Sequence, residues 1–317
     1  MAFHGEPETP ELPLARHLRG SRSSRRADRI FTSISLGSGL VVLAVLTGIV
    51  VATTTYAWPA IEREGWGFFT GTTWSSASDT YGALPLVYGT IVTSLIALVI
   101  AVPMSIGVAL FATELCPRRL RGPLVALIDL LAAVPSVVYG LVGLLAFHDV
   151  LQRIYRTFAG PSASGSSLLT AGIVVAFMIT PVITSITRDV IATVPRPGID
   201  AAWALGATRM EVVRTAILPA SAGGITGAVM LGLGRALGET IAVALVVGSS
   251  VQITANVTEP GYTMASIIAN TFNGEGNLLN QQSLMGLGVV LFAITIIVNV
   301  GARVIVDRAQ RRLEGTA

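Results

Sequence analysis

The sequence contains no lysine, and all 21 basic residues among its 317 positions are arginines. A P-loop needs a lysine on the nucleotide phosphates and Schiff-base catalysis needs a lysine amine, so the chain carries neither its own Walker-type ATPase site nor lysine-dependent catalysis. Its one cysteine, Cys116, cannot form an internal disulfide, and the three histidines (His4, His17, His148) are too scattered for a metal cluster. We therefore expect no catalytic residue, no cofactor and no metal.

Charged residues are also scarce, at 12%, whereas hydrophobic residues make up 52% and the mean hydropathy is +0.71. These values are typical of a membrane protein, and a hydrocarbon core of about 30 Å needs about 20 helical residues. Six apolar runs are long enough: 30–56, 84–112, 123–147, 168–187, 219–250 and 284–305. They are continuously apolar, unlike the alternating strands of a β-barrel. The sequence predicts an all-α polytopic membrane protein with about six transmembrane helices.

The arginines predict the orientation, because short cytoplasmic loops collect basic residues. Seventeen arginines fall on one side of the six runs, and only Arg63, Arg153 and Arg156 fall on the other. We expect both termini to be cytoplasmic and the loops 57–83, 148–167 and 251–283 to face outward. Nothing in the sequence points to a nucleic acid partner.

The chain divides by composition. Residues 1–29 are rich in Pro, Ser, Glu and Arg without apolar periodicity, which predicts a disordered cytoplasmic tail rather than a cleaved signal peptide. The remaining predicted parts are a first transmembrane helix (30–56), an extracytoplasmic loop (57–83), a core of five transmembrane helices (84–306) that contains a cytoplasmic loop (195–220), and a cytoplasmic C-terminal tail (307–317).

The outer loop 57–83 is rich in aromatic residues. Three interpretations remain open: a belt at the membrane interface, the core of a small external cap, or a surface that docks a partner. The residues concerned are Trp58, Trp66, Phe68, Phe69 and Trp74.

The loop 195–220 predicts two short helices joined by a glycine turn. We expect Pro195, Pro197 and Gly198 to end the fourth helix, Asp200 to be the N-cap of a helix from Ala201, Gly206 to reverse the chain, and Thr208 with Glu211 to form a capping box. The small side chains of Ala201 and Ala202 allow another helix or groove to approach this face closely. Trp203, Leu205 and Met210 place apolar side chains on a loop in water. This composition indicates a partner, although the loop could instead pack under its own bundle.

The same stretch resembles the EAA loop of ABC importer membrane subunits. The matching residues are Asp200, Ala201, Ala202, Gly206, Leu218 and Pro219, with Asp200 in place of the usual glutamate and Ala216 at the usual isoleucine position. In that family the loop is the coupling helix that inserts into a groove of the cytoplasmic ATPase. The resemblance implies ATPase coupling through Asp200, Ala201, Ala202, Gly206, Ala207, Thr208, Arg209, Met210 and Glu211.

Two charges lie inside the fifth run, Arg235 near mid-membrane and Glu239 four residues on. Charges in lipid are costly, so both should face the bundle interior or water, and their i, i+4 spacing predicts a shared helix face. Either they lock helices together, or Arg235 is the oxyanion-binding residue of an anion-selective constriction with Glu239 as a competitor. Nearby glycines predict close packing, either within the chain or with a second subunit: Gly223, Gly227, Gly232, Gly234 and Gly238.

Several other polar residues are candidates for the same pathway. Ser136, Tyr139, Thr184 and Thr240 offer hydroxyls that either line an anion path or join helices. Asp129, inside the third run, needs a partner, for which Arg235, Arg188 and water all remain open.

Three strings, YGALPLVYGTIVTS (81–94), LAAVPSVVYG (131–140) and RALGETIAV (235–243), resemble the phosphate-specific ABC importer permeases, and the PstC-type subunit more than the PstA type. The resemblance covers roughly residues 30–310. It implies a type I importer half-channel for phosphate in the bacterial inner membrane, with a PstA-type permease, an ABC ATPase dimer and an extracytoplasmic phosphate-binding protein as partners. Local electrostatics alone fit sulfate, molybdate or phosphonate equally. A secondary anion carrier and a scaffold with purely structural charges also remain open.

Overall fold

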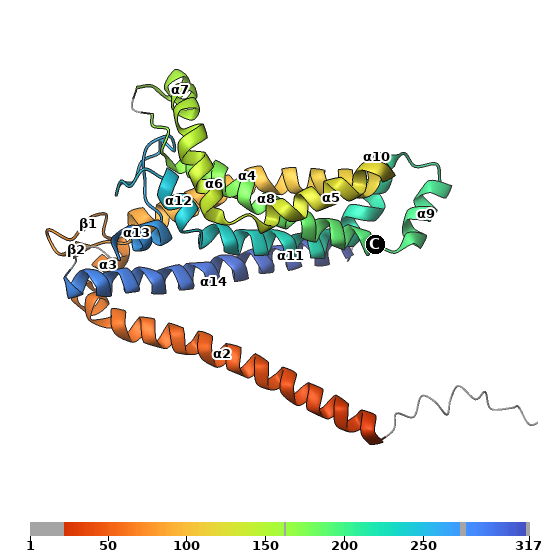
Figure 1. The fold of residues 1–317 in the computed structure, drawn as a ribbon, viewed down its shortest axis with the longest axis horizontal. Coiled ribbons are helices and arrows are strands. Elements are labelled where there is room, and N and C mark those ends of the chain that lie inside the picture. Colours follow the sequence, from red (N-terminus) through yellow and green to blue (C-terminus); the bar gives the residue numbers. More distant parts are fainter. Residues whose placement is uncertain (1–21, 162, 273–276, 315–317) are drawn as a thin grey trace, which may run out of the picture. The chain divides into compact units, whose positions relative to one another are not determined.

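The computed structural model describes residues 22–161, 163–272 and 277–314 (Figure 1). Apart from one two-stranded hairpin and an isolated bridge, the regular secondary structure of these residues is helical, so the all-α prediction is confirmed. Six helices of the described part are long and apolar enough to span a membrane, as predicted: Arg29–Glu64, Leu84–Leu115, Ser136–Ala159, Leu168–Ala192, Arg209–Leu237 and Leu278–Val304.

The chain forms two compact units, residues 1–52 and 53–317. Helix α2 (Arg22–Glu64) runs through both and begins before the expected start at residue 30. No proline or glycine separates residue 22 from the apolar run, so the helix propagates into part of the predicted tail. Residues 1–21 of that tail lie outside the described residues. At the other end of the chain, α14 (Leu278–Glu314) continues into the predicted C-terminal tail.

One end of the second unit is a small cap. It consists of α3 (Gly67–Thr70), a hairpin of β1 (Trp74–Ser75) and β2 (Thr80–Tyr81), and α13 (Met264–Thr271). Phe68 is fully buried among residues of this cap and of α14, and Trp74 packs against the same cluster. Trp58 and Trp66 instead remain 56% and 83% exposed. The cap interpretation therefore accounts for only part of the aromatic loop.

The centre of this unit is a bundle of α4 (Leu84–Leu110), α8 (Leu168–Ala192), α11 (Leu218–Leu237) and α14. A π-helical turn, Phe111–Leu115, extends α4. Small residues bring α4 and α8 close together: Ala97 and Ala101 are fully buried, and a Cβ on Gly172 would lie 2.5 Å from the Ile96 side chain.

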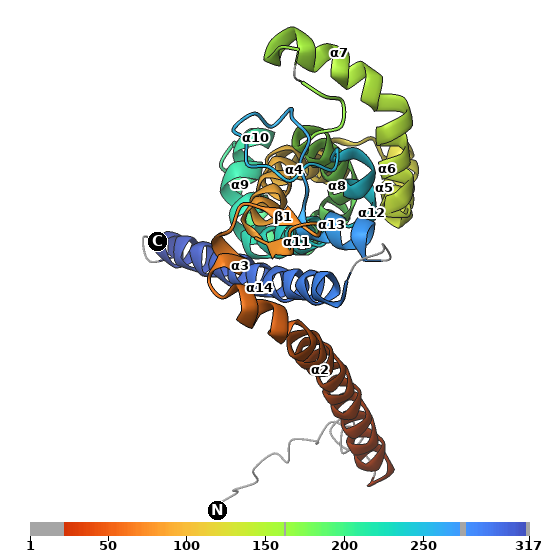
Figure 2. The same ribbon diagram turned by 90° about the vertical axis from the view of Figure 1, so that its left-hand side faces the viewer.

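The third apolar run is not one helix, contrary to the prediction. It is divided into α5 (Arg118–Ala133) and α6 (Ser136–Val142), which continues through a π-helical turn (Gly143–Phe147) into α7 (His148–Ala159). Val134 and Pro135 between them are extended, with ψ of 129° and 138°. Proline disfavours a helical residue before it, which explains the break. Figures 1 and 2 show α7 running across the axis of the bundle.

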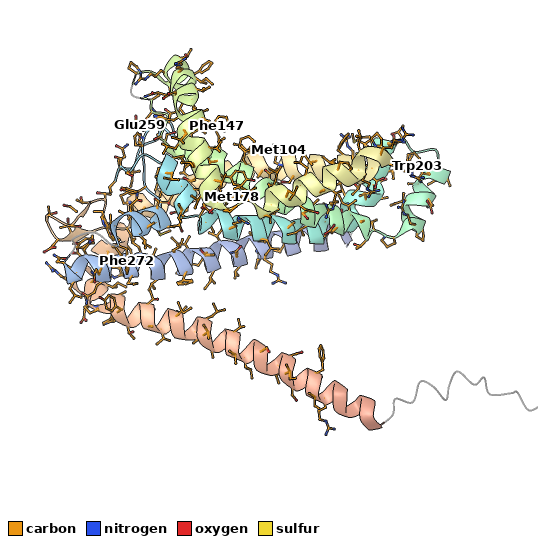
Figure 3. All side chains as sticks on the ribbon, viewed as in Figure 1. Met104, Phe147, Met178, Trp203, Glu259 and Phe272 are labelled. Carbon is orange, nitrogen blue, oxygen red and sulfur yellow. The ribbon has the colours of Figure 1, made fainter. Side chains whose placement is uncertain are left out.

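The predicted fifth span, 219–250, is wrong at both ends. The helix starts at α10 (Arg209–Val212), passes through a π-helical turn (Val213–Ile217) and ends with α11, and after Gly238–Thr240 a separate helix α12 (Ile241–Val246) follows. Together with α9 (Arg196–Ala204), α10 lies at the opposite end of the bundle from the cap. Figure 3 shows Trp203 at this end and Phe272 and Glu259 at the cap end.

Candidate functional site

Arg235 and Glu239 do not form the predicted pair on one helix face. Arg235 lies exposed in the last turn of α11, whereas Glu239 follows the end of the helix at Gly238 and is 9% exposed. The Glu239 carboxylate accepts a hydrogen bond from the backbone N–H of Ala242, 3.2 Å away, in the first turn of α12. No ion pair joins the two charges in the described part of the chain. The Glu239 carboxylate thus binds a backbone N–H that has no partner within α12, rather than the Arg235 guanidinium.

Arg235 belongs to a line of exposed residues along α11. They recur at about every fourth position, so they share one face of the helix: Gly223, Gly227, Leu231, Arg235 and Gly238. Gly224 and Gly232, by contrast, pack on α8, against Val190 and Ile183. Of the predicted glycines, Gly232 therefore packs within the chain, whereas Gly223 and Gly227 lie on an open face, where packing with a second subunit stays a prediction.

The two strings of residues 131–140 and 235–243 meet in space. A Cβ on Gly140 of α6 would lie 2.7 Å from the Cα of Ala242 in α12, so these two helices touch through their backbones. Tyr139 precedes Gly140 on α6, and its side chain is half-buried there. Its hydroxyl donates a hydrogen bond to the Leu131 carbonyl oxygen, 2.9 Å away, at the end of α5.

The remaining hydroxyl candidates differ in position. Ser136 and Thr240 are half-buried beside the breaks that follow α5 and α11, and the Thr240 hydroxyl donates to the Gly238 carbonyl at 3.0 Å. Thr184 is 1% exposed inside α8, and its oxygen has no hydrogen-bond partner among the described residues. The chain's own atoms therefore separate Thr184 from the open face of α11.

Asp129 takes Arg188 as its partner, rather than Arg235. The carboxylate of Asp129 lies 3.4 Å from the Arg188 guanidinium and accepts a hydrogen bond from Ser185 at 3.0 Å. Arg188 also pairs with Asp189 at 2.9 Å. This cluster ties α5 to α8.

The loop 195–220 has the predicted capping box and glycine turn, but its first helix begins earlier than predicted. The capping box is confirmed, since the Thr208 N–H donates to Glu211 at 2.7 Å and the Glu211 N–H donates to the Thr208 hydroxyl at 3.4 Å. Gly206 has φ +80°, as a sharp reversal requires. Asp200 is not an N-cap, because α9 begins four residues earlier, at Arg196. Pro197 sits in the first turn of α9, where a missing N–H costs nothing.

Exposure divides this loop into two faces. Ala202 and Ala207 pack inward with Ile199 against the ends of α4 and α8. The outward side exposes Asp200, Ala201, Trp203, Leu205, Thr208, Arg209, Met210 and Glu211. Leu205 is 89% exposed and Met210 59%, so the apolar side chains expected to face water do so.

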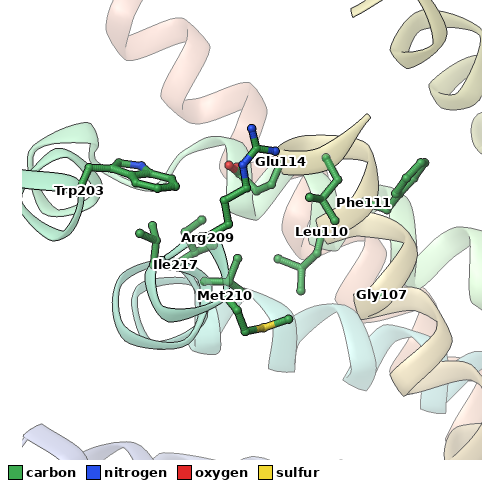
Figure 4. Close-up of a pocket in the computed structure, with 11 residues that line it drawn as sticks. Gly107, Leu110, Phe111, Glu114, Trp203, Arg209, Met210 and Ile217 are labelled. Carbon is green, nitrogen blue, oxygen red and sulfur yellow. The ribbon is translucent and has the colours of Figure 1, made fainter. Parts of the chain in front are cut away.

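A pocket of about 410 Å³ lies between this loop and the end of α4 (Figure 4). Trp203, Arg209 and Met210 line it from the loop. Leu110, Phe111 and Glu114 line it from the other side, and none of these three was predicted to belong to a site. A signal was available for Glu114, which is an acid next to the arginines at 118, 119 and 121.

Comparison with known proteins connects this geometry to a family. Residues 105–315 match the model of the binding-protein-dependent transport system inner membrane component. A phosphate transport system permease protein PstC from Mesorhizobium japonicum is 39% identical, with 95% of this chain and 97% of the relative covered. A PstC from Xylella fastidiosa is 40% identical, with 96% of this chain and 97% of that relative covered. The chain belongs to the PstC family of transport permeases.

The fold agrees with this family. A bacterial alginate ABC transporter, solved in complex with a pentasaccharide-bound periplasmic protein, contains a chain that matches with a TM-score of 0.63, at 13% identity over 90% of this chain and 96% of that one. The architecture is therefore that of a type I ABC importer permease. Within the PstC family, the chain is a multi-pass membrane permease subunit.

Proposed function

We propose that this chain forms half of the translocation pathway of an ATP-driven importer for inorganic phosphate. The observation that carries the proposal is the placement of Arg235, an exposed guanidinium on the open face of α11. A guanidinium fork binds tetrahedral oxyanions through two parallel N–H groups. The PstC relatives favour phosphate over sulfate, molybdate or phosphonate.

In this proposal the substrate pathway includes Arg235, Glu239, Thr240, Ser136 and Tyr139. Glu239 acts mainly by holding the start of α12, through its bond to Ala242, and so fixes the break beside Arg235. Thr184 is buried in α8, so its part is to pack the pathway wall rather than to contact the anion.

The loop 195–220 couples the pathway to a separate ATPase. Its outward apolar side chains and the pocket against α4 offer a surface for a cytoplasmic partner. The complete transporter would contain a PstA-type permease, an ATPase dimer that hydrolyses ATP and an extracytoplasmic phosphate-binding protein. We place it in the bacterial inner membrane with both termini cytoplasmic, as the arginine distribution favours.

The test is radiolabelled phosphate uptake in proteoliposomes that hold this chain with those partners. ATP-dependent uptake that resists excess sulfate supports the proposal, and Arg235→Ala should reduce it by about tenfold or more, the effect of losing a charged hydrogen-bond donor. Arg235→Lys is the matched control, since it keeps the charge without the fork, and we expect an intermediate rate. Gradient-driven uptake by this chain alone, indifferent to ATP, would indicate a secondary carrier instead.

A further inference from the structure

A hollow of about 860 Å³ lies on the side of α11 that faces α14. Its floor is formed by glycines of α11, among them Gly223, Gly227 and Gly234. A Cβ on Gly227 would meet no atom within 4 Å, so the floor is open. The polar groups that line the hollow are Thr226 on α11 and Asn299 and Arg303 on α14.

Asn299 lies within the apolar, membrane-length part of α14, and Arg303 lies near the end of that part, on the side where the arginine distribution places the cytoplasm. Lipid contact is costly for an arginine or an amide, so such residues face a partner or water. Neither Asn299 nor Arg303 has a hydrogen bond or ion pair among the side chains that the structure describes. Among the described residues that line the hollow, the one charged side chain is Arg303, which is positive.

The hollow continues the open face that carries Arg235. A Cβ on Gly234, the neighbour of Arg235, would lie 3.9 Å from the Asn299 amide nitrogen, so Asn299 stands level with the arginine. Arg303 follows one helical turn later on α14, in the direction of the end where α9 and α10 lie (Figure 1). The three side chains therefore succeed one another along the bundle.

We propose that this hollow is a second anion-binding station, at which Asn299 and Arg303 receive phosphate after it leaves Arg235. This inference rests on the proposed function. The Asn299 amide and the Arg303 guanidinium donate hydrogen bonds to the anion, and the bare glycine floor leaves room for it. Two weak stations in sequence permit both entry and release, which one tight site does not.

Thiol labelling in the assembled complex tests the station. In a Cys116→Ser background, Gly227→Cys places a thiol on the open floor, and Ile297→Cys, 67% exposed on α14, is the control for an apolar face. We expect a negatively charged sulfonate thiol reagent to label Gly227→Cys about tenfold faster than a positively charged ammonium reagent, because the Arg303 charge attracts it. Adding Arg303→Gln should abolish that preference, and inorganic phosphate should slow the labelling. Ile297→Cys should react with neither reagent.

Three results overturn the proposal. No labelling at Gly227→Cys would mean that a helix of the second subunit fills the hollow. Equal labelling by both reagents would mean a wet space without anion selectivity. Equal rates at Gly227→Cys and Ile297→Cys would mean that the hollow is not distinct from the rest of the surface. The wild-type complex is assayed for ATP-driven phosphate uptake in parallel, so that failure of the proposed function is seen there and failure of the station in the labelling.

Discussion

Gly140 and Ala242 bring two broken segments of the bundle into backbone contact, because a Cβ on the glycine would lie 2.7 Å from the Cα of the alanine. The contact joins α6, which follows the break at Pro135, to α12, which follows the break at Gly238. The geometry around Arg235 and Tyr139 therefore depends on a residue without a side chain.

We expect Gly140→Ala to destabilise the protein by about 1 to 3 kcal/mol, the usual cost of overpacking, and to lower phosphate uptake. The matched control is Gly122→Ala in α5, where a Cβ meets no atom within 4 Å. That substitution should stabilise its helix by up to about 1 kcal/mol. Thermal unfolding of the two purified variants in detergent makes the comparison, and equal shifts would contradict the contact.

Two substitutions of Glu239 distinguish a structural role of its carboxylate from an electrostatic one. Glu239→Gln keeps an oxygen that accepts from the Ala242 N–H, whereas Glu239→Ala removes it. If the residue acts mainly by holding α12, the glutamine variant should retain most of its stability and uptake, and the alanine variant should lose about 0.5 to 2 kcal/mol. Thermal unfolding and uptake are measured together. Equal loss of uptake in both variants, at unchanged stability, would show that the charge itself is required.

Gly206 adopts the backbone conformation that the turn in the loop 195–220 requires. Its φ of +80° costs a residue with a Cβ about 1 to 2 kcal/mol, and a β-branched residue is the least suited to it. We expect Gly206→Val to weaken ATPase binding and substrate-stimulated ATP hydrolysis, and Gly206→Asn to have a smaller effect. Gly198→Ala, at a position with free space, is the control. Unchanged co-purification of the ATPase with Gly206→Val would exclude this loop as the docking site.

The Asp129–Arg188 pair predicts an asymmetry between its partners. The Asp129 side chain is 48% exposed and Arg188 only 14%, and Arg188 keeps Asp189 as a second partner. Asp129→Asn should therefore cost less than about 1 kcal/mol. Arg188→Leu should cost more, since it leaves Asp129 and Asp189 without their cation. Unfolding measured at low and high salt checks the order, and a larger loss for Asp129→Asn would reverse our account of the cluster.

The sequence predicted the number of spans because hydropathy is averaged over about 20 residues, the length of a span. A break or bend within an apolar run does not change that average. The breaks could not be read from hydropathy. Val134–Pro135 and Gly238–Thr240 lie within apolar surroundings, and proline and glycine are tolerated inside membrane helices when neighbours satisfy the backbone. Pro135 was a visible signal for a kink, but hydropathy does not indicate the hydrogen bond that spans the break, from the Tyr139 hydroxyl to the Leu131 carbonyl.

Local chemistry was more predictable than pairing. The capping box of Thr208 and Glu211 depends on residues three positions apart, and both of its hydrogen bonds are present. The pairing of Arg235 with Glu239 also rested on local spacing, but it assumed a continuous helix. Asn299 was not predicted, because a single amide in an apolar run has no periodic signature. Its proposed role depends on its position opposite Gly234 in the folded chain.

Helix α12 is six residues long, or about 9 Å, and both of its ends are fastened. Glu239 holds the first turn, and the Val246 and Val247 carbonyls accept hydrogen bonds from Ser167 and Gly261. One inserted residue would rotate everything beyond it by about 100° relative to Glu239. The length of α12 therefore sets the spacing between Arg235 and the loop at the cap end. That length, more than the side chains of the segment, fixes the position of the loop.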